Sequence, residues 1–166
     1  MRMLITAISL AFLAAPPAVL AQDAPVVSVF ATSEDGGHYL SYFLEDCGEC
    51  GVAQFTCGDG SGVRLWLPDF EEQVLGKWLA EAGARVLMGM GDTLIEFVPR
   101  QMTFSEMTGA WDVEFVAWGY DASALEPLAL AETAMIETTR GDITLPAFER
   151  DSAKARAFID ACLQGG

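Results

Sequence analysis

The chain contains 166 residues, among which 24 Asp and Glu outnumber 9 Lys and Arg, so its formal net charge is −15. A surface of this sign repels nucleic acid and anionic lipid, and it attracts basic proteins, cationic polymers and metal ions. The acidity has a simpler interpretation as well, because it keeps a secreted protein in solution. We therefore expect no nucleic-acid partner, and the length suits one domain with its own core.

Residues 1–21 have the order of parts that is typical of a cleavable secretory signal peptide. Arg2 supplies the positive start, Leu4 to Leu13 form the apolar run, and Val19 and Ala21 place small residues before the cleavage site. The alternative is a membrane anchor, but the apolar run is shorter than the roughly 20 residues that cross a bilayer. We expect a periplasmic or secreted protein with no transmembrane segment after cleavage.

The first part of the mature chain is predicted to be rich in strands. Residues 22–37 are expected to form an extended N-terminal segment, and residues 38–166 a single disulfide-containing domain. A first strand is predicted from Tyr39 to Leu44. Two further runs, Val52 to Cys57 and Val63 to Leu67, flank a glycine-rich loop whose residues tolerate positive φ, which predicts a hairpin.

A helix is predicted from Asp69 to about Gly83. Asp69 can cap the first turn, Glu72 stands where it can reach back to the cap, and Gly83 can end the helix. Apolar side chains recur between these ends at helical spacing. We expect this helix to depend on packing, because Gly76 lies inside it and costs about 1 kcal/mol relative to alanine.

The remainder of the chain returns to strands and closes with a helix. Ser123 and Glu126 form a capping box for a short helix through about Ala131, and a last helix is predicted from about Asp151 to Gln164. Strands are predicted at residues 85–90, 93–98 with a continuation at 101–104, 111–118, 134–139 and 143–146. Because strands and helices do not alternate regularly, the expected class is α+β: a mostly antiparallel β-sheet or sandwich with one mid-chain helix and one C-terminal helix.

Four cysteines lie in the mature chain, at Cys47, Cys50, Cys57 and Cys162, and an even number in an exported protein favours two disulfides. Three pairings are possible. We favour Cys47–Cys50 and Cys57–Cys162, because Cys162 lies on the apolar face of the last helix and Cys57 ends a core strand. A bridge between these two would join the helix to the sheet.

The cysteines could also serve a chemical function, either as a redox-active pair or as zinc ligands. A redox-active pair at Cys47 and Cys50 needs a lowered thiol pKa, and the neighbouring Glu45, Asp46 and Glu49 oppose that shift. Zinc could be held by His38 together with Cys47, Cys50 and Cys57, but their spacing is not that of a zinc finger or ribbon. Structural disulfides remain the preferred hypothesis.

No catalytic, cofactor-binding or metal residue is predicted. His38 is the only histidine, and no Gly-x-Ser-x-Gly motif accompanies it, so we interpret it as a polar surface residue. Met88, Met90, Met102 and Met107 suggest Cu(I) ligands, but alternating methionines are also typical of core filling, which we prefer. With 24 carboxylates, some pair must lie close together, so hydrolysis by paired carboxylates stays an alternative.

Two stretches resemble known families. The run Gly141-Asp142-Ile143-Thr144-Leu145-Pro146, followed by a helix that ends in Ala161-Cys162, resembles the C-terminal third of small exported bacterial proteins of the invasion-associated locus B type. This resemblance implies a signal peptide, a β-rich body and an alanine-rich helix with a closing cysteine. The hairpin from Phe55 to Gly60, with Val63 to Leu67 behind it, resembles the opening of small periplasmic lysozyme inhibitors.

These observations predict an exported, acidic, non-enzymatic binding module for a basic protein or an envelope component. The alternatives are an inhibitor of a cationic cell-wall-degrading enzyme and a carboxylate-dependent hydrolase. A hydrolase should hold two carboxylates that face each other in a cleft, whereas a binding module should present a flat or convex acidic face.

Overall fold

The computed structural model describes residues 25–47, 50–58, 62–71, 85–90, 92–117, 122–129, 133–138, 141–146 and 152–164. These ranges contain nine strands, one 3-10 helix and one α-helix. Their bounds are β1 (Val26–Thr32), β2 (His38–Leu44), β3 (Gly51–Cys57), β4 (Arg64–Phe70), β5 (Val86–Met90), β6 (Thr93–Ser105), β7 (Ala110–Ala117), η1 (Ala122–Ala129), β8 (Thr133–Thr138), β9 (Gly141–Pro146) and α2 (Ser152–Gln164).

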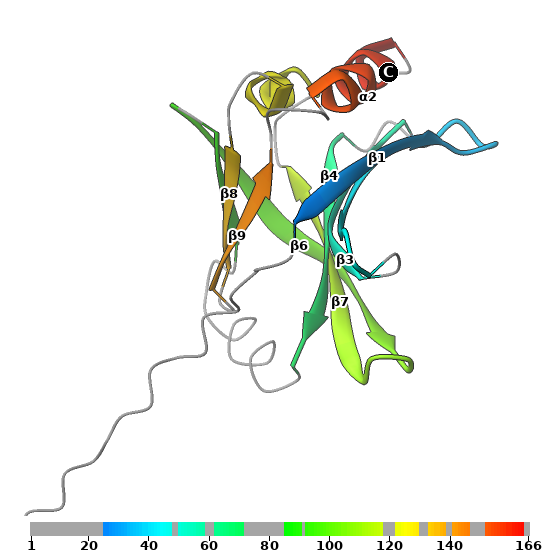
Figure 1. The fold of residues 1–166 in the computed structure, drawn as a ribbon, viewed down its shortest axis with the longest axis vertical. Coiled ribbons are helices and arrows are strands. Elements are labelled where there is room, and N and C mark those ends of the chain that lie inside the picture. The colour runs from blue at the N-terminus through cyan, green and yellow to red at the C-terminus, as the bar shows by residue number, and fades with distance from the viewer. Residues whose placement is uncertain are drawn as a thin grey trace, which may run out of the picture.

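All nine strands belong to one antiparallel sheet with the order β1-β2-β3-β4-β7-β6-β5-β8-β9. The sheet curls so far that its two edge strands, β1 and β9, come into contact, and it is therefore a nearly closed barrel (Figure 1). The predicted antiparallel α+β class is confirmed in this coarse form. The segment that we expected to be extended contributes β1, which pairs along its length with β2.

The barrel interior is filled by side chains that alternate along the strands. In β7, for example, Val113, Phe115 and Ala117 point inward, because successive residues of a strand face opposite sides. Aromatic rings contact one another inside, and the Phe55 ring lies 6.2 Å from that of Tyr42, edge to face. The largest of the wholly buried side chains are Tyr42, Phe55, Phe70, Phe97, Phe115, Phe158, Leu40, Leu65, Leu67, Met88 and Ile95.

The predicted mid-chain helix does not begin at Asp69. Asp69 has a φ of 64° and lies in β4, where the pairing with β7 shifts between Leu67 and Phe70. Aspartate tolerates this left-handed conformation better than most residues, and the bulge turns Phe70 into the core, where it is only 1% exposed. Residues 72–83 of the predicted helix lie outside the described residues.

The long strand β6 continues past Pro99, as predicted, and ends at Ser105. Its register with β7 shifts between Pro99 and Gln101, as expected at a residue that cannot donate a backbone hydrogen bond. The β6–β7 hairpin consequently extends well beyond the neighbouring strand β5 (Figure 1).

One end of the barrel is covered by η1 and α2, which pack against each other (Figure 1). The predicted C-terminal helix is confirmed, with Ala155, Phe158, Ile159 and Cys162 on its buried face. The short helix predicted from Ser123 is present as the 3-10 helix η1. Lys154 of α2 donates a hydrogen bond of 2.6 Å from its Nζ to the backbone oxygen of Ser28 in β1.

Within the ranges described here, no helix is both long and apolar enough to cross a membrane.

Candidate functional site

The four cysteines form two disulfides with the pairing that the sequence favoured. Cys57 of β3 is bonded to Cys162 of α2, and the bridge closes a sequence separation of 105 residues. Cys47 is bonded to Cys50 in the turn between β2 and β3, with their Cα atoms 5.3 Å apart. The first bridge joins the covering helix to the barrel, and the second fixes a turn. Both are compatible with maturation in an oxidising compartment.

Every cysteine of the chain is paired in these two disulfides. His38 lies at the start of β2, where its Nδ1 is 3.1 Å from the Thr32 hydroxyl oxygen. Its backbone is opposite Cys57 in the register of β2 with β3. Across the described ranges, no three His, Cys, Asp or Glu side chains are grouped as metal ligands.

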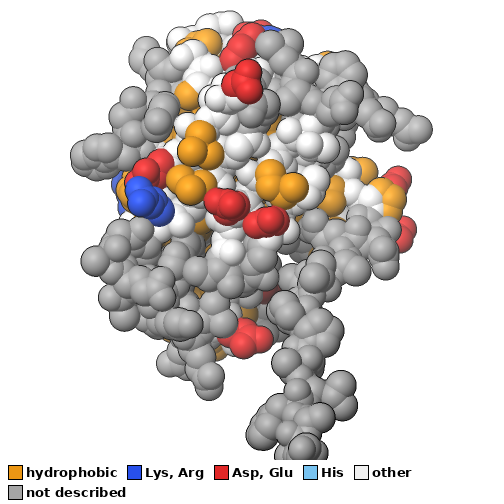
Figure 2. All heavy atoms as spheres, turned by 90° about the vertical axis from the view of Figure 1, so that its left-hand side faces the viewer, with side chains coloured by type: hydrophobic (Ala, Val, Ile, Leu, Met, Phe, Trp, Pro, Cys, Tyr) orange, Lys and Arg blue, Asp and Glu red, His pale blue; other side chains and the backbone are white. Residues whose placement is uncertain are grey.

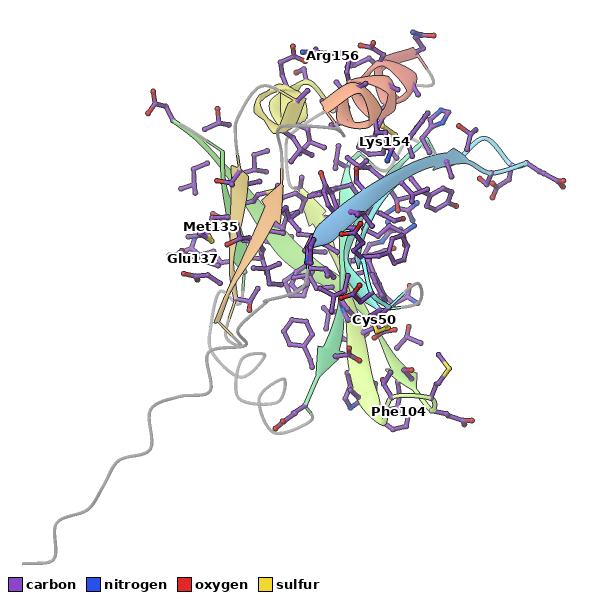
Figure 3. All side chains as sticks on the ribbon, viewed as in Figure 1. Cys50, Phe104, Met135, Glu137, Lys154 and Arg156 are labelled. Carbon is purple, nitrogen blue, oxygen red and sulfur yellow. A yellow bond between two sulfur atoms is a disulfide. The ribbon has the colours of Figure 1, made fainter. Side chains whose placement is uncertain are left out.

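The described methionines that the sequence singled out lie in different surroundings, and the side chain of Met90 is outside the described residues. Met88 is buried in the core, which confirms its predicted role as core filling, whereas Met107 at the tip of the β6–β7 hairpin is 86% exposed. Met102 and Phe104 are exposed on the same hairpin, and the Phe104 ring lies 5.3 Å from that of Trp111, edge to face. Figure 3 shows Phe104 at the far end of the molecule from α2. This hairpin tip carries exposed apolar side chains next to Glu106, and it is distinct from the surface described next.

One pair of carboxylates is brought together by the β4 bulge. The backbone N–H of Asp69 donates to the Asp112 Oδ1 atom over 3.4 Å. Burial raises the pKa of Asp112, and the Asp69 charge raises it further, although hydrogen bonds from the Asp69 backbone and the Trp66 side chain oppose the shift. Asp69 itself is exposed. The two carboxylates therefore have unequal environments.

A more extensive group of side chains lies on the outer surface of β6, β5, β8 and β9, which we call the acidic face. The outward residues on these strands alternate with the buried ones, and they combine carboxylates with apolar groups (Figure 2). The acidic face consists of Leu87, Gly89, Leu94, Glu96, Met135, Glu137, Asp142 and Thr144. Figure 3 shows Met135 and Glu137 both pointing away from the barrel.

Strand register arranges the acidic face in two rows. Gly89 pairs with Leu94 on one side and with Met135 on the other, and Met135 pairs in turn with Thr144. This first row is mainly apolar. Leu94 is 59% and Met135 is 40% exposed, which are large values for such side chains.

The second row carries the charges. Leu87 pairs with Glu96 and with Glu137, and Glu137 lies directly opposite Asp142 of β9. Like charges in such a cross-strand pair destabilise a sheet. Arg85 binds Glu96 with an N–O distance of 3.0 Å, but within the described ranges neither Glu137 nor Asp142 is part of an ion pair.

The surface around this row is slightly hollowed. A shallow depression of about 310 Å³ is lined by Arg85, Leu87, Glu137, Thr138 and Asp142. Glu137 and Asp142, which line it, are both exposed. The depression is open to solvent, so it suits contact with a side chain of a partner better than enclosure of a substrate.

None of the residues of the acidic face was predicted from the sequence to be a site residue. In the structure residue 137 pairs with residue 142, whereas a two-residue turn at Arg140 and Gly141, as predicted, would pair residue 137 with residue 144. The contact between β5 and β8 joins segments more than 40 residues apart and leaves no local signal.

A comparison with models of protein families, with curated proteins and with solved structures finds no match to this chain. Its class is accordingly defined by its own structure: a nearly closed antiparallel barrel, covered at one end by helices, with an acidic and apolar face on its outer surface.

Proposed function

We propose that this protein is an exported binding module that holds a basic protein or a basic envelope component on its acidic face. The observation that carries the proposal is the Glu137–Asp142 pair, two exposed carboxylates on neighbouring strands that form no ion pair within the described ranges. Exposed Leu94 and Met135 lie beside them. A cationic partner would relieve the repulsion and cover the apolar side chains in one contact.

The charge of the whole chain supports the same partner. A net charge of −15 attracts a basic protein from a distance, which speeds association, and the local pair then fixes where it binds. Residues with large exposed apolar areas next to charges are typical of contact surfaces.

Binding is favoured over hydrolysis because of where the carboxylates lie. A general acid that works near neutral pH needs a carboxyl group that is shielded from water, so that its pKa is raised. Glu137 and Asp142 are both exposed around a shallow depression. An inhibitor of a cationic cell-wall-degrading enzyme would use the same face and is distinguished by its effect on the enzyme.

Export and family membership belong to the proposal. The two disulfides support maturation outside the cytoplasm, where thiols oxidise. Cleavage of residues 1–21 and the resemblance to proteins of the invasion-associated locus B type stay predictions.

The proposal can be tested with two basic proteins of known structure, lysozyme and cytochrome c. Binding to the mature protein is measured by calorimetry from about 50 mM to about 300 mM salt, since screening weakens exposed charge pairs over this range. The double variant Glu137→Gln/Asp142→Asn should bind roughly ten-fold more weakly at low salt, because each exposed charge pair is worth up to about 1 kcal/mol. The activity of lysozyme is recorded in the same samples.

The matched control is Glu45→Gln/Asp46→Asn, which makes the same change in net charge at exposed positions in the β2–β3 turn. It should change the dissociation constant less than two-fold. Equal weakening by both double variants, or no binding of either basic protein at low salt, would overturn the proposal. Inhibition of lysozyme that the first double variant abolishes would favour the inhibitor alternative.

A further inference from the structure

Gly89 lies at a position in the sheet where a residue with a side chain would fit without a steric clash. It lies in the middle of β5, has no positive φ, and a Cβ built there would have the Met135 backbone oxygen as its nearest neighbour, at 4.0 Å. Other glycines have evident structural reasons: a Cβ at Gly51 would lie 3.0 Å from the Trp66 ring, and Gly58 has a φ of 112°. Glycine inside a strand weakens it, and it often marks a place where another molecule approaches the backbone.

The side chains on either side leave the surface above Gly89 open. Leu94 and Met135 are its cross-strand neighbours on β6 and β8, and the space that a side chain at position 89 would fill between them is what we call the Gly89 notch. The Thr144 hydroxyl donates to the Met135 Sδ atom over 3.3 Å. Because Thr144 is on β9, on the side of β8 away from β5, this contact holds Met135 away from the notch.

The notch lies next to the charged row of the acidic face. Gly89 and Glu137 are diagonal neighbours on β5 and β8, since Gly89 pairs with Met135 two residues away. Such neighbours are about 7–8 Å apart. Side chains two residues apart on an extended peptide are separated by roughly 6.6 Å on one face, so one can enter the notch while the next reaches Glu137 and Asp142.

We propose that the Gly89 notch receives an aliphatic side chain of an extended basic segment of the partner, with a Lys or Arg two residues away bound by Glu137 and Asp142. This inference rests on the proposed function, and it specifies the sequence pattern in the partner that the acidic face would recognise. The glycine is then retained for recognition, at the expense of strand stability.

The experiment uses the disulfide-bonded mature protein and three capped peptides, Lys-Ser-Leu-Ser-Lys, Lys-Ser-Ala-Ser-Lys and Gln-Ser-Leu-Ser-Gln, titrated by NMR. The first should bind roughly five- to ten-fold more tightly than the second, because the leucine buries more apolar surface. The third should bind more weakly than the first, because it lacks the cations. The peptide pattern places a cation on both sides of the leucine, so either chain direction can satisfy it.

The decisive variant is Gly89→Val, which fills the notch with a residue that strands prefer. It should raise the midpoint of thermal unfolding by a few degrees and bind the leucine peptide no better than the alanine peptide. The control Ser41→Val places the same side chain at an outward position on β2 and should leave the preference for leucine unchanged.

The possible failures are distinct. If both lysine peptides bind equally well and Gly89→Val changes neither affinity, the notch is not a subsite, while the proposed function stands. A fall in thermal stability of Gly89→Val would also overturn the inference, because it would assign the glycine a structural role. If no lysine peptide binds the unaltered protein, the inference and the proposed acidic binding face both fail.

Discussion

Burial and the charge of neighbouring Asp69 act together on the carboxyl group of Asp112. Both raise the pKa of its carboxyl group, burial more than the Asp69 charge. A carboxyl group with a raised pKa in the folded protein adds stability only while it is protonated. That contribution is complete below the pKa of the unfolded chain, and it is lost as the pH rises through the folded pKa.

The variant Asp112→Asn should therefore be more stable than the unaltered protein at about pH 7 and equally stable at about pH 3. The amide oxygen can still accept the hydrogen bond from the Asp69 backbone. Urea denaturation followed by circular dichroism at several pH values measures the difference in unfolding free energy.

Asp35 provides a control of opposite sign. Hydrogen bonds from the Ser33 hydroxyl and the Gly37 backbone lower the pKa of Asp35, so its contribution is present above the unfolded pKa and is lost in acid. Asp35→Asn should destabilise at about pH 7, and the loss should shrink toward low pH. An Asp112→Asn protein that is less stable at neutral pH would show that the hydrogen bonds outweigh burial.

At the scale of elements, the two disulfides differ in what they connect. Cys57–Cys162 fastens α2 over one end of the barrel across 105 residues, whereas Cys47–Cys50 spans 3 residues within a turn. A cross-link restricts the unfolded chain more when the loop that it closes is longer. The first bridge should therefore contribute most of the stability that cross-linking provides.

Replacing both cysteines of a bridge by alanine tests this difference. The chain-entropy relation predicts a loss of roughly 5 kcal/mol for Cys57→Ala/Cys162→Ala and roughly 2 kcal/mol for Cys47→Ala/Cys50→Ala. Urea denaturation of the three oxidised proteins measures both losses, and the turn variant serves as the control. Equal losses would mean that the bridges act through local contacts in the folded protein.

The strands and the last helix could be predicted from the sequence because their signals are local. Apolar and polar residues alternate from Val113 to Ala117, which predicted the strand β7, and the turn residues around Arg140 predicted a strand on either side of them. The position of Cys162 on the apolar face of the last helix indicated its disulfide with Cys57. The start at Asp69 was wrong because a capping pattern and a bulge residue both favour aspartate. The curling of the sheet, and with it the contact between β5 and β8, depends on pairings distant in sequence that no local pattern specifies.

Over the whole molecule, the net charge of −15 opposes compactness as well as attracting partners. The Lys and Arg residues are already counted in this value, so ion pairs such as Arg64–Glu114 and Arg85–Glu96 do not reduce the excess. Dissolved salt screens the resulting repulsion. Folding and binding should therefore respond to salt in opposite directions.

We predict that the midpoint of thermal unfolding rises between about 10 mM and about 300 mM sodium chloride, while the affinity for a basic protein falls. Circular dichroism at increasing temperature measures the first effect. Potassium chloride is the control, since screening depends on ionic strength and not on the cation. A midpoint that falls with salt would show that attractive ion pairs dominate the electrostatics of the fold.

The contact between Lys154 and Ser28 bears on how copies of the molecule behave toward one another. The Glu45 N–H donates to the Pro25 oxygen over 2.7 Å, so the alternation of an antiparallel pair turns the backbone groups of Ser28 outward, away from β2. An edge strand whose backbone groups are not hydrogen-bonded to a neighbouring strand can pair with another chain, and a lysine is among the groups that prevent such pairing. Lys154 of α2 places its ammonium group on that carbonyl, so this backbone oxygen is not open to a strand of another copy.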